Sequence, residues 1–144
     1  MQTFITNHNY MTIAKTLDYK RLGKQRVESW QIYKALSGQS KGWVNHPAVR
    51  MWSGYEFSLT VYGICMCVEW QQRGYRDQML DRFVNLAKVL PDTGRPAFTD
   101  DERVILSHRS NLIRKFPEFY GPLFPGVPDD LPYYWPEPAT MKGA

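Results

Sequence analysis

The spacing of apolar side chains along the chain predicts a protein made mainly of α-helices. After Asp18, apolar positions recur at roughly helical spacing up to Leu36. Asp18 is the expected N-capping residue of this helix, and Gly38 follows its end. The segment 55–73 is apolar almost all round and is followed by Gly74. We therefore expect it to form the central helix of the core.

Shorter signals predict three further helices. Pro47 can open a short helix at its first turn. Asp77 is placed to cap a segment that Pro91 stops. Thr99 and Glu102 have the spacing of a capping box, in which each side chain binds a free amide near the other residue. We therefore expect helices from residue 47, over 77–89 and from the capping box to about 116.

The C-terminal segment 117–144 differs from the rest of the chain. Seven of the ten prolines lie between Pro117 and Pro138, which excludes a regular helix or a central strand. The same stretch holds six aromatic side chains, so we expect it to wrap the surface and pack its rings into grooves. The predicted architecture is a single compact all-α domain over residues 1–144, with this irregular segment on its outside.

Composition narrows the class of protein. The chain has 144 residues, which is long enough to bury one core. It is 43% hydrophobic and 22% charged, a composition typical of a globular protein. No stretch reaches the ~18–20 apolar residues of a membrane span, and the start lacks a secretory pattern. Two cysteines and three scattered histidines suggest neither a disulfide framework nor a metal site. We expect a cytoplasmic protein that needs no cofactor or metal and binds no membrane.

Positive charge is concentrated at the N-terminal end of the chain. Residues 1–50 carry eight basic and two acidic side chains, whereas residues 51–144 carry ten basic and twelve acidic ones. A basic third on a nearly neutral body suggests a face that binds a polyanion. A solvated helix surface explains the same charges equally well.

A single carboxylate among cations is the first candidate for chemistry. Arg21, Lys24 and Glu28 are spaced to share one face of the predicted helix. Gln25 lies on the same face, and Lys20 precedes them. Glu28 can act as a general base or stabilise a developing cation, while the cations bind phosphates. The alternative is an ordinary surface pair of Lys24 with Glu28, worth roughly a few tenths of a kcal/mol.

A second polar segment precedes the short helix predicted from residue 47. Asn45 and His46 stand where free backbone amides can bind an anion, and Arg50 lies one turn further on. These residues suit a phosphate contact. The alternative is a loop in which Asn45 and His46 cap the helix while Trp43 and Trp52 pack inward.

A third polar segment contains His108 and Arg109, on the helix predicted after the capping box. They could meet phosphate or support Glu28. A solvated helix face is an equally good explanation.

These segments form part of a pattern that resembles a known family. Together they resemble the pyrimidine-dimer DNA glycosylases of the phage endonuclease V type, and more closely a branch of short phage and bacterial members. The link to the founding enzyme depends mainly on the helix with Arg21, Arg26 and Glu28. The matching pieces, in order, are Leu17-Asp18, Arg21-Leu22-Gly23, Arg26, Glu28, Asn45-His46-Pro47, Trp52, Arg73-Gly74-Tyr75, 107–112 and 120–124.

The resemblance implies an all-helical domain that binds double-stranded DNA and extrudes a base for excision, in DNA repair or phage DNA modification. In the founding enzyme an N-terminal α-amine attacks C1′ of the sugar, forms an imine and cleaves the strand by β-elimination, an AP lyase step. The catalytic glutamate corresponds to Glu28. An arginine directly precedes it in the founding enzyme; Val27 stands there in this chain, and Arg26 is the substitute. The residues expected to bind DNA are Lys20, Arg21, Lys24, Asn45, His46, Arg50, His108 and Arg109.

The nucleophile is where this chain departs from the family pattern. The family amine belongs to a small residue exposed by removal of the initiator methionine, but Gln2 is too large for efficient removal. Three nucleophiles are open: the α-amine of Met1, the side chain of Lys20 or Lys24, or water activated by Glu28.

Three functions follow from these observations. The first is an N-glycosylase that acts on a damaged or modified pyrimidine in duplex DNA, with or without AP lyase activity. The second is a non-catalytic DNA-binding protein that kept the fold and lost the nucleophile. The third is a protein-interaction module that uses the aromatic C-terminal segment.

Overall fold

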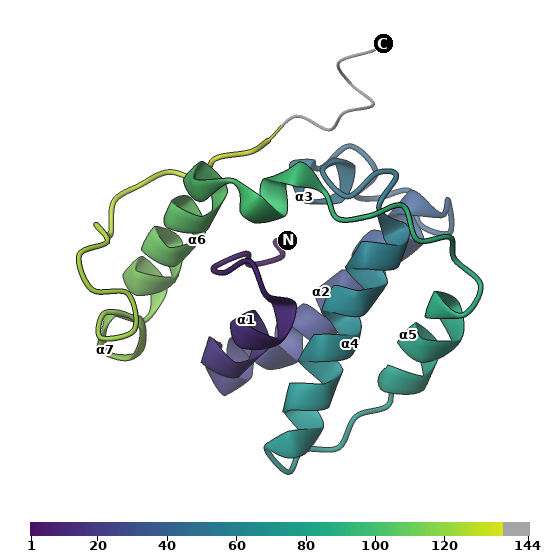
Figure 1. Ribbon diagram of the computed structural model, residues 1–144, viewed down its shortest axis with the longest axis horizontal. Helices are drawn as coiled ribbons and strands as arrows, with labels where there is room; N and C mark the ends of the chain where they lie inside the picture. The colour runs from purple at the N-terminus through teal and green to yellow at the C-terminus, as the bar shows by residue number, and fades with distance from the viewer. Residues whose placement is uncertain (137–144) are drawn as a thin grey trace.

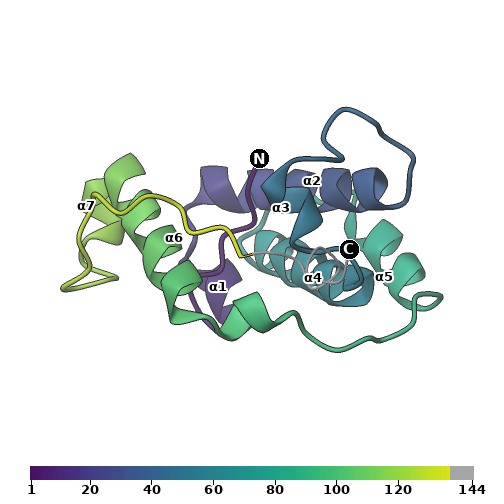
Figure 2. The ribbon, with the colours of Figure 1, turned by 90° about the horizontal axis from the view of Figure 1, so that it is seen from above.

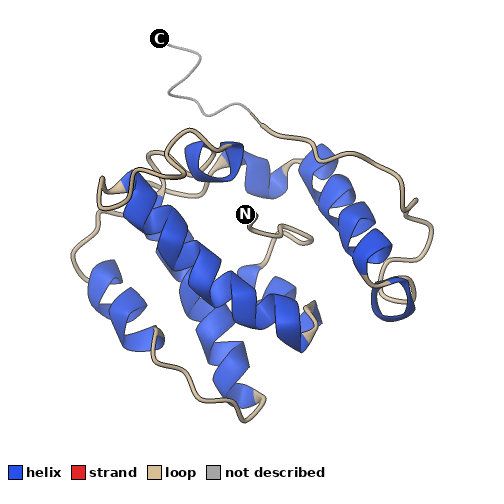
Figure 3. Cartoon of the chain, turned by 180° about the vertical axis from the view of Figure 1, so that it is seen from behind, coloured by secondary structure: helices blue, strands red, loops and turns tan. Residues whose placement is uncertain are grey.

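The computed structural model describes residues 1–136, and helices are the only regular elements in that range (Figure 3). This confirms the predicted all-α class. Residues 137–144 of the predicted C-terminal segment, which include Pro138, lie outside the described residues. The elements are α1 (Tyr10–Thr16), α2 (Tyr19–Leu36), α3 (Pro47–Arg50), α4 (Glu56–Gln72), α5 (Leu80–Ala87), the 3-10 helix η1 (Ala97–Asp100), α6 (Glu102–Lys115) and α7 (Pro117–Tyr120).

The longest helices, α2 and α4, pack against each other, and α4 also contacts α1 and α5 (Figure 1). Tyr62 and Met66 of α4 are fully buried, which confirms that this segment forms the central helix of the core. Gly63 lets α5 come close, because a Cβ at that position would lie 2.6 Å from the ring of Phe83. Burial of these apolar side chains is the main force that holds the helices together.

The start of α2 agrees with the prediction, but the role of its capping residue does not. α2 begins after Asp18, yet the Asp18 carboxylate makes no capping hydrogen bond to the helix. It accepts a hydrogen bond from the hydroxyl of Tyr120 and pairs with Arg21. The carboxylate therefore binds Tyr120, which is distant in sequence, instead of the free backbone N–H groups at the start of α2.

The predicted capping box at Thr99 is wrong. Thr99 lies within η1, where its hydroxyl donates to the carbonyl of Pro96. The capping residue of α6 is Asp101, whose carboxylate accepts the N–H of Arg103 at 2.9 Å. Asp77 does bind the start of the next helix, because its Oδ2 accepts the N–H of Leu80 at 2.6 Å. The capping residue of α5 is Met79, however, and the helix spans Leu80–Ala87 rather than the predicted 77–89.

The C-terminal segment covers α6 and returns toward α3 (Figure 2). Tyr120 and Phe124 are buried, and Tyr133 and Trp135 pack partly buried against the core. This confirms, up to residue 136, that the segment wraps the surface and packs its rings inward. Its first residues form the short helix α7, because proline is accepted at the first turn of a helix.

The first six residues run through the middle of the fold, between α6 on one side and α2 with α4 on the other (Figure 1). Residues 2–6 are all buried. A buried segment outside a helix must find hydrogen-bond partners for its backbone. In this protein those partners are mainly side chains, and they determine where the N-terminus lies.

Candidate active site

A hollow of about 400 Å³ opens between the N-terminus, α2, the end of α6 and the C-terminal segment. Its volume falls within the ~300–1,000 Å³ of small-molecule sites. Successive turns of α2 contribute side chains to this hollow, which confirms the shared face predicted for this helix. The charged groups in its wall come from Met1, Lys20, Arg21, Lys24, Glu28 and Lys115.

The Glu28 carboxylate is oriented by two N–H donors. Its Oε2 accepts the backbone N–H of Gln2 at 3.3 Å and the side-chain amide of Gln25 at 3.2 Å. Hydrogen bonds from N–H groups fix the direction of a carboxylate. Within residues 1–136 the structure records no ion pair between Lys24 and Glu28, so the predicted surface pair is wrong. Glu28 instead faces the N-terminal segment.

Gln25 connects α2 to the N-terminal segment, a role that the sequence pattern did not predict. Its Oε1 accepts the N–H of Phe4 at 3.1 Å, and its Nε2 donates to the carbonyl of Gln2 at 2.9 Å. Gln25 is buried on the inward stripe of α2, between Leu22 and Ser29. An amide side chain on such a stripe is the signal that could have found it, because buried polar groups need partners.

Two consecutive residues of α6 hold the N-terminal segment from the other side. The Nδ1 of His108 accepts the N–H of Ile5 at 2.8 Å, and the Nε of Arg109 donates to the carbonyl of Thr6 at 2.9 Å. His108 is fully buried, and burial lowers its pKa to about 3. Its ring is therefore neutral and can accept at Nδ1. Both residues position the N-terminal segment; His108 is fully buried in this arrangement, and a contact of Arg109 with DNA stays a prediction.

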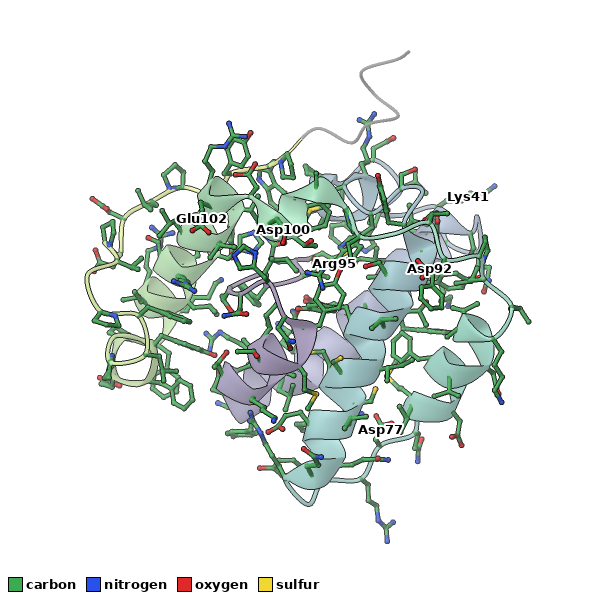
Figure 4. The ribbon with its side chains drawn as sticks, viewed as in Figure 1. Lys41, Asp77, Asp92, Arg95, Asp100 and Glu102 are labelled. Carbon is green, nitrogen blue, oxygen red and sulfur yellow. The ribbon has the colours of Figure 1, made fainter. Side chains whose placement is uncertain are left out.

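Arg26 lies outside this hollow and lines a second one, on the other side of α2, so its catalytic role stays a prediction. Its guanidinium pairs with Asp77 at 2.9 Å and lies 4.6 Å from the centre of the Trp70 ring. Asp77 belongs to the connection between α4 and α5 (Figure 4). A helix turns by 100° per residue, so the position two residues before Glu28 points away from it. Arg26 therefore joins α2 to that connection.

His46 caps α3 and lies near the N-terminal amine. Its Nδ1 accepts the N–H of Ala48 at 3.0 Å, which confirms the capping alternative for this residue. Burial lowers the pKa of His46, and the positive charge of the N-terminal amine lowers it further. Asn45 is exposed in the loop before it, and Arg50 is half-buried on α3. Both remain available to a ligand at this edge.

The two tryptophans of this region differ from each other. Trp52 is fully buried, as predicted, and its Nε1 donates to the Thr3 hydroxyl at 3.0 Å. Trp43 is 49% exposed, so the expectation that it packs inward is wrong.

A second hollow, of about 440 Å³, lies across α2 from the first. Lys20, Lys24 and Glu28 belong to the walls of both, and Trp70 closes the second. The cations Lys20 and Lys24 therefore form a ridge between two hollows.

Within residues 1–136 no group of three or more histidine, cysteine, aspartate or glutamate side chains could hold a metal ion. In that same part of the chain, no helix has the length and hydropathy needed to cross a membrane.

The comparison with known families decides where this arrangement belongs. The sequence model of the family described as pyrimidine dimer DNA glycosylase matches residues 1–83 of this chain. The chain belongs to the pyrimidine dimer DNA glycosylase family. The matched residues include the N-terminal segment and all of α2, with Glu28 and Gln25. No curated protein and no solved structure gives a significant match to the chain.

Membership of the pyrimidine dimer DNA glycosylase family implies pyrimidine dimer DNA glycosylase activity, with DNA as the substrate. The matched part ends within α5, so α6 with His108 and Arg109 lies beyond it. Of the two helices that hold the N-terminal segment, α2 lies inside the matched region and α6 lies outside it.

Proposed function

We propose that this protein excises a damaged or modified pyrimidine from duplex DNA and then cleaves the strand as an AP lyase, with the α-amine of Met1 as nucleophile. The hydrogen bond from the Gln2 N–H to Glu28 carries this proposal. It holds the start of the chain against the carboxylate, in a hollow that Met1 also lines. An amine beside an oriented carboxylate is suited to covalent attack followed by proton transfer.

In the proposed reaction the neutral amine donates its lone pair to C1′ of the target sugar. The bond between C1′ and the base nitrogen breaks, and the base leaves with that electron pair and takes up a proton. Glu28 accepts a proton from the attacking nitrogen and stabilises the cationic character of the sugar. Opening of the sugar ring gives an imine. Loss of a proton from C2′ then expels the 3′ phosphate by β-elimination.

The cations around the hollow are proposed to hold the DNA strand on either side of the target. Lys20 and Lys24 are exposed on α2, and Lys115 is exposed at the end of α6. Lysine and arginine contacts to phosphate position a duplex without reading its sequence. With Arg21, these side chains form a positive rim around one carboxylate.

Borohydride trapping tests the proposal. The protein is mixed with duplexes that carry an abasic site, a thymine dimer or an ordinary base pair, and any reduced adduct is located by mass spectrometry. An adduct on the N-terminal residue supports the amine, and one on Lys20 or Lys24 moves the nucleophile to α2. Base release without an adduct means that Glu28 activates water. Binding with neither adduct nor release from any substrate assigns the non-catalytic alternative.

A further inference from the structure

The loop between α2 and α3 presents a bulky apolar tip to solvent. Trp43 is 49% exposed and Val44 is 39% exposed, next to each other in the chain. Buried aromatic rings contribute much of the packing energy of a small domain. The half-exposed indole of Trp43 contributes little packing energy to this fold. An exposed tryptophan on a loop is the side chain expected where a protein inserts into, or stacks on, another molecule.

A row of rings leads from the hollow with Glu28 to Trp43. Tyr133 lines the hollow, and its ring centre lies 5.6 Å from that of Trp135. Trp135 lies 5.8 Å from His46, and His46 lies 5.5 Å from Trp43. Figure 2 shows this loop and the N-terminus on the same side of the molecule. This row of rings connects the exposed indole to the wall of the hollow.

The charge around the loop favours a polyanion as its occupant. From residue 29 to residue 55 the chain has no acidic side chain. Lys41 lies two residues before Trp43 in the loop (Figure 4), and Arg50 follows on α3. An apolar tip with Lys41 and Arg50 in the same acid-free segment matches the two parts of a DNA duplex, because phosphates lie outside and the base stack lies between them.

We propose that Trp43 is a wedge that enters the base stack of duplex DNA beside the target nucleotide, with Val44 packed against the same step. This inference rests on the proposed base excision, because extrusion of a nucleotide leaves a gap and costs stacking energy. An indole that fills the gap replaces part of the lost stacking and keeps the nucleotide outside. Phosphate contacts from Lys41 and Arg50 hold the loop in place.

Fluorescence of a base analogue tests insertion without any need for turnover. A duplex carries an uncleavable abasic analogue with 2-aminopurine on its 3′ side, and saturating protein is added. We expect the intact protein to quench the 2-aminopurine by stacking of the indole. Trp43→Ala should lose the quenching, Trp43→Phe should keep part of it, and Val89→Ala, which changes an exposed side chain on another part of the surface, should quench fully. Equal quenching by Trp43→Ala and the intact protein overturns the proposal.

Base release separates a wedge from a general DNA contact. Trp43→Ala should slow single-turnover release from a duplex by at least about tenfold and leave release from the same single strand unchanged, because a single strand has no stack to open. Equal loss on both substrates overturns the wedge. The quenching assay also works with a protein that releases no base, so failure of the proposed excision and failure of the wedge give different results.

Discussion

The imidazole of His108 accepts the backbone N–H of Ile5 at 2.8 Å, across 103 residues of sequence. A helix near the end of the chain thereby fixes a segment at its beginning. Gln25 binds the same segment from α2, and Glu28 lies one turn after Gln25. The place of the N-terminal amine relative to Glu28 thus depends on two helices that are remote in sequence.

Replacing His108 should loosen the N-terminal segment. His108→Leu leaves the Ile5 N–H without an acceptor in a buried position, and we expect a loss of about 1–3 kcal/mol in the free energy of unfolding. His108→Asn retains an acceptor and should lose less. Urea unfolding measures both, and borohydride trapping of the folded proteins should fall more for the leucine variant. Identical trapping rates in the two variants contradict a positioning role.

The buried ring of His108 also predicts how stability depends on pH. Its folded pKa of about 3 lies below the ordinary 6.5, so the unfolded chain binds the extra proton first as the pH falls. The stability due to the neutral ring is complete above pH 6.5 and is lost between there and about pH 3. The loss is at most about 1.4 kcal/mol per pH unit. Urea unfolding from pH 7 to pH 4 should show a shallower slope for His108→Asn than for the unchanged protein; parallel slopes would exclude this group as the cause.

Glu28→Gln should abolish base release and strand cleavage while DNA affinity stays equal or becomes tighter. The amide cannot accept the proton from the attacking amine, and the change removes a negative charge beside the phosphate-binding cations. Fluorescence anisotropy measures the affinity and a gel assay measures turnover. Lys24→Gln serves as a matched change on the same helix face and should act on affinity. Retained turnover in Glu28→Gln would show that the catalytic group lies elsewhere.

Lys24→Ala should weaken DNA binding and reduce its dependence on salt. Lys24 is exposed on the ridge between the two hollows. For each phosphate contact that is lost, the slope of log K against log salt should fall by about 0.9. Anisotropy titrations at several salt concentrations give the slope. Lys88→Ala, on another part of the surface, is the control, and an equal change in that variant would mean that only the net charge matters.

Arg26→Ala should act on folding rather than on DNA. Its guanidinium neutralises Asp77, whose side chain is 0% exposed, and loss of one partner in a buried pair costs about 3–5 kcal/mol. Asp77 keeps its bonds to backbone N–H groups at the start of α5, which favours the lower end of that range. Thermal or urea unfolding measures the loss. A stable variant with a reduced salt slope would instead support a phosphate contact by Arg26.

The sequence by itself determined the two longest helices and the composition of one helix face. Contacts three and four residues apart repeat along the chain, so the bounds of α2 and α4, and the shared face of Arg21, Lys24 and Glu28, follow from spacing alone. The hydrogen bond from the start of α5 to Asp77 followed for the same reason. Each of these features depends on a few neighbouring residues.

Only the tertiary structure decided which polar groups face the site. His108 and Arg109 resemble residues of a solvated helix face in sequence, yet both bind the backbone of the N-terminal segment. Arg26 lies two residues after Lys24, and its partner Asp77 lies 51 residues further along the chain. Partners this distant leave no periodic signal in a single chain, because they depend on how the helices pack after they form. The same packing brings Met1 and Glu28 into one hollow.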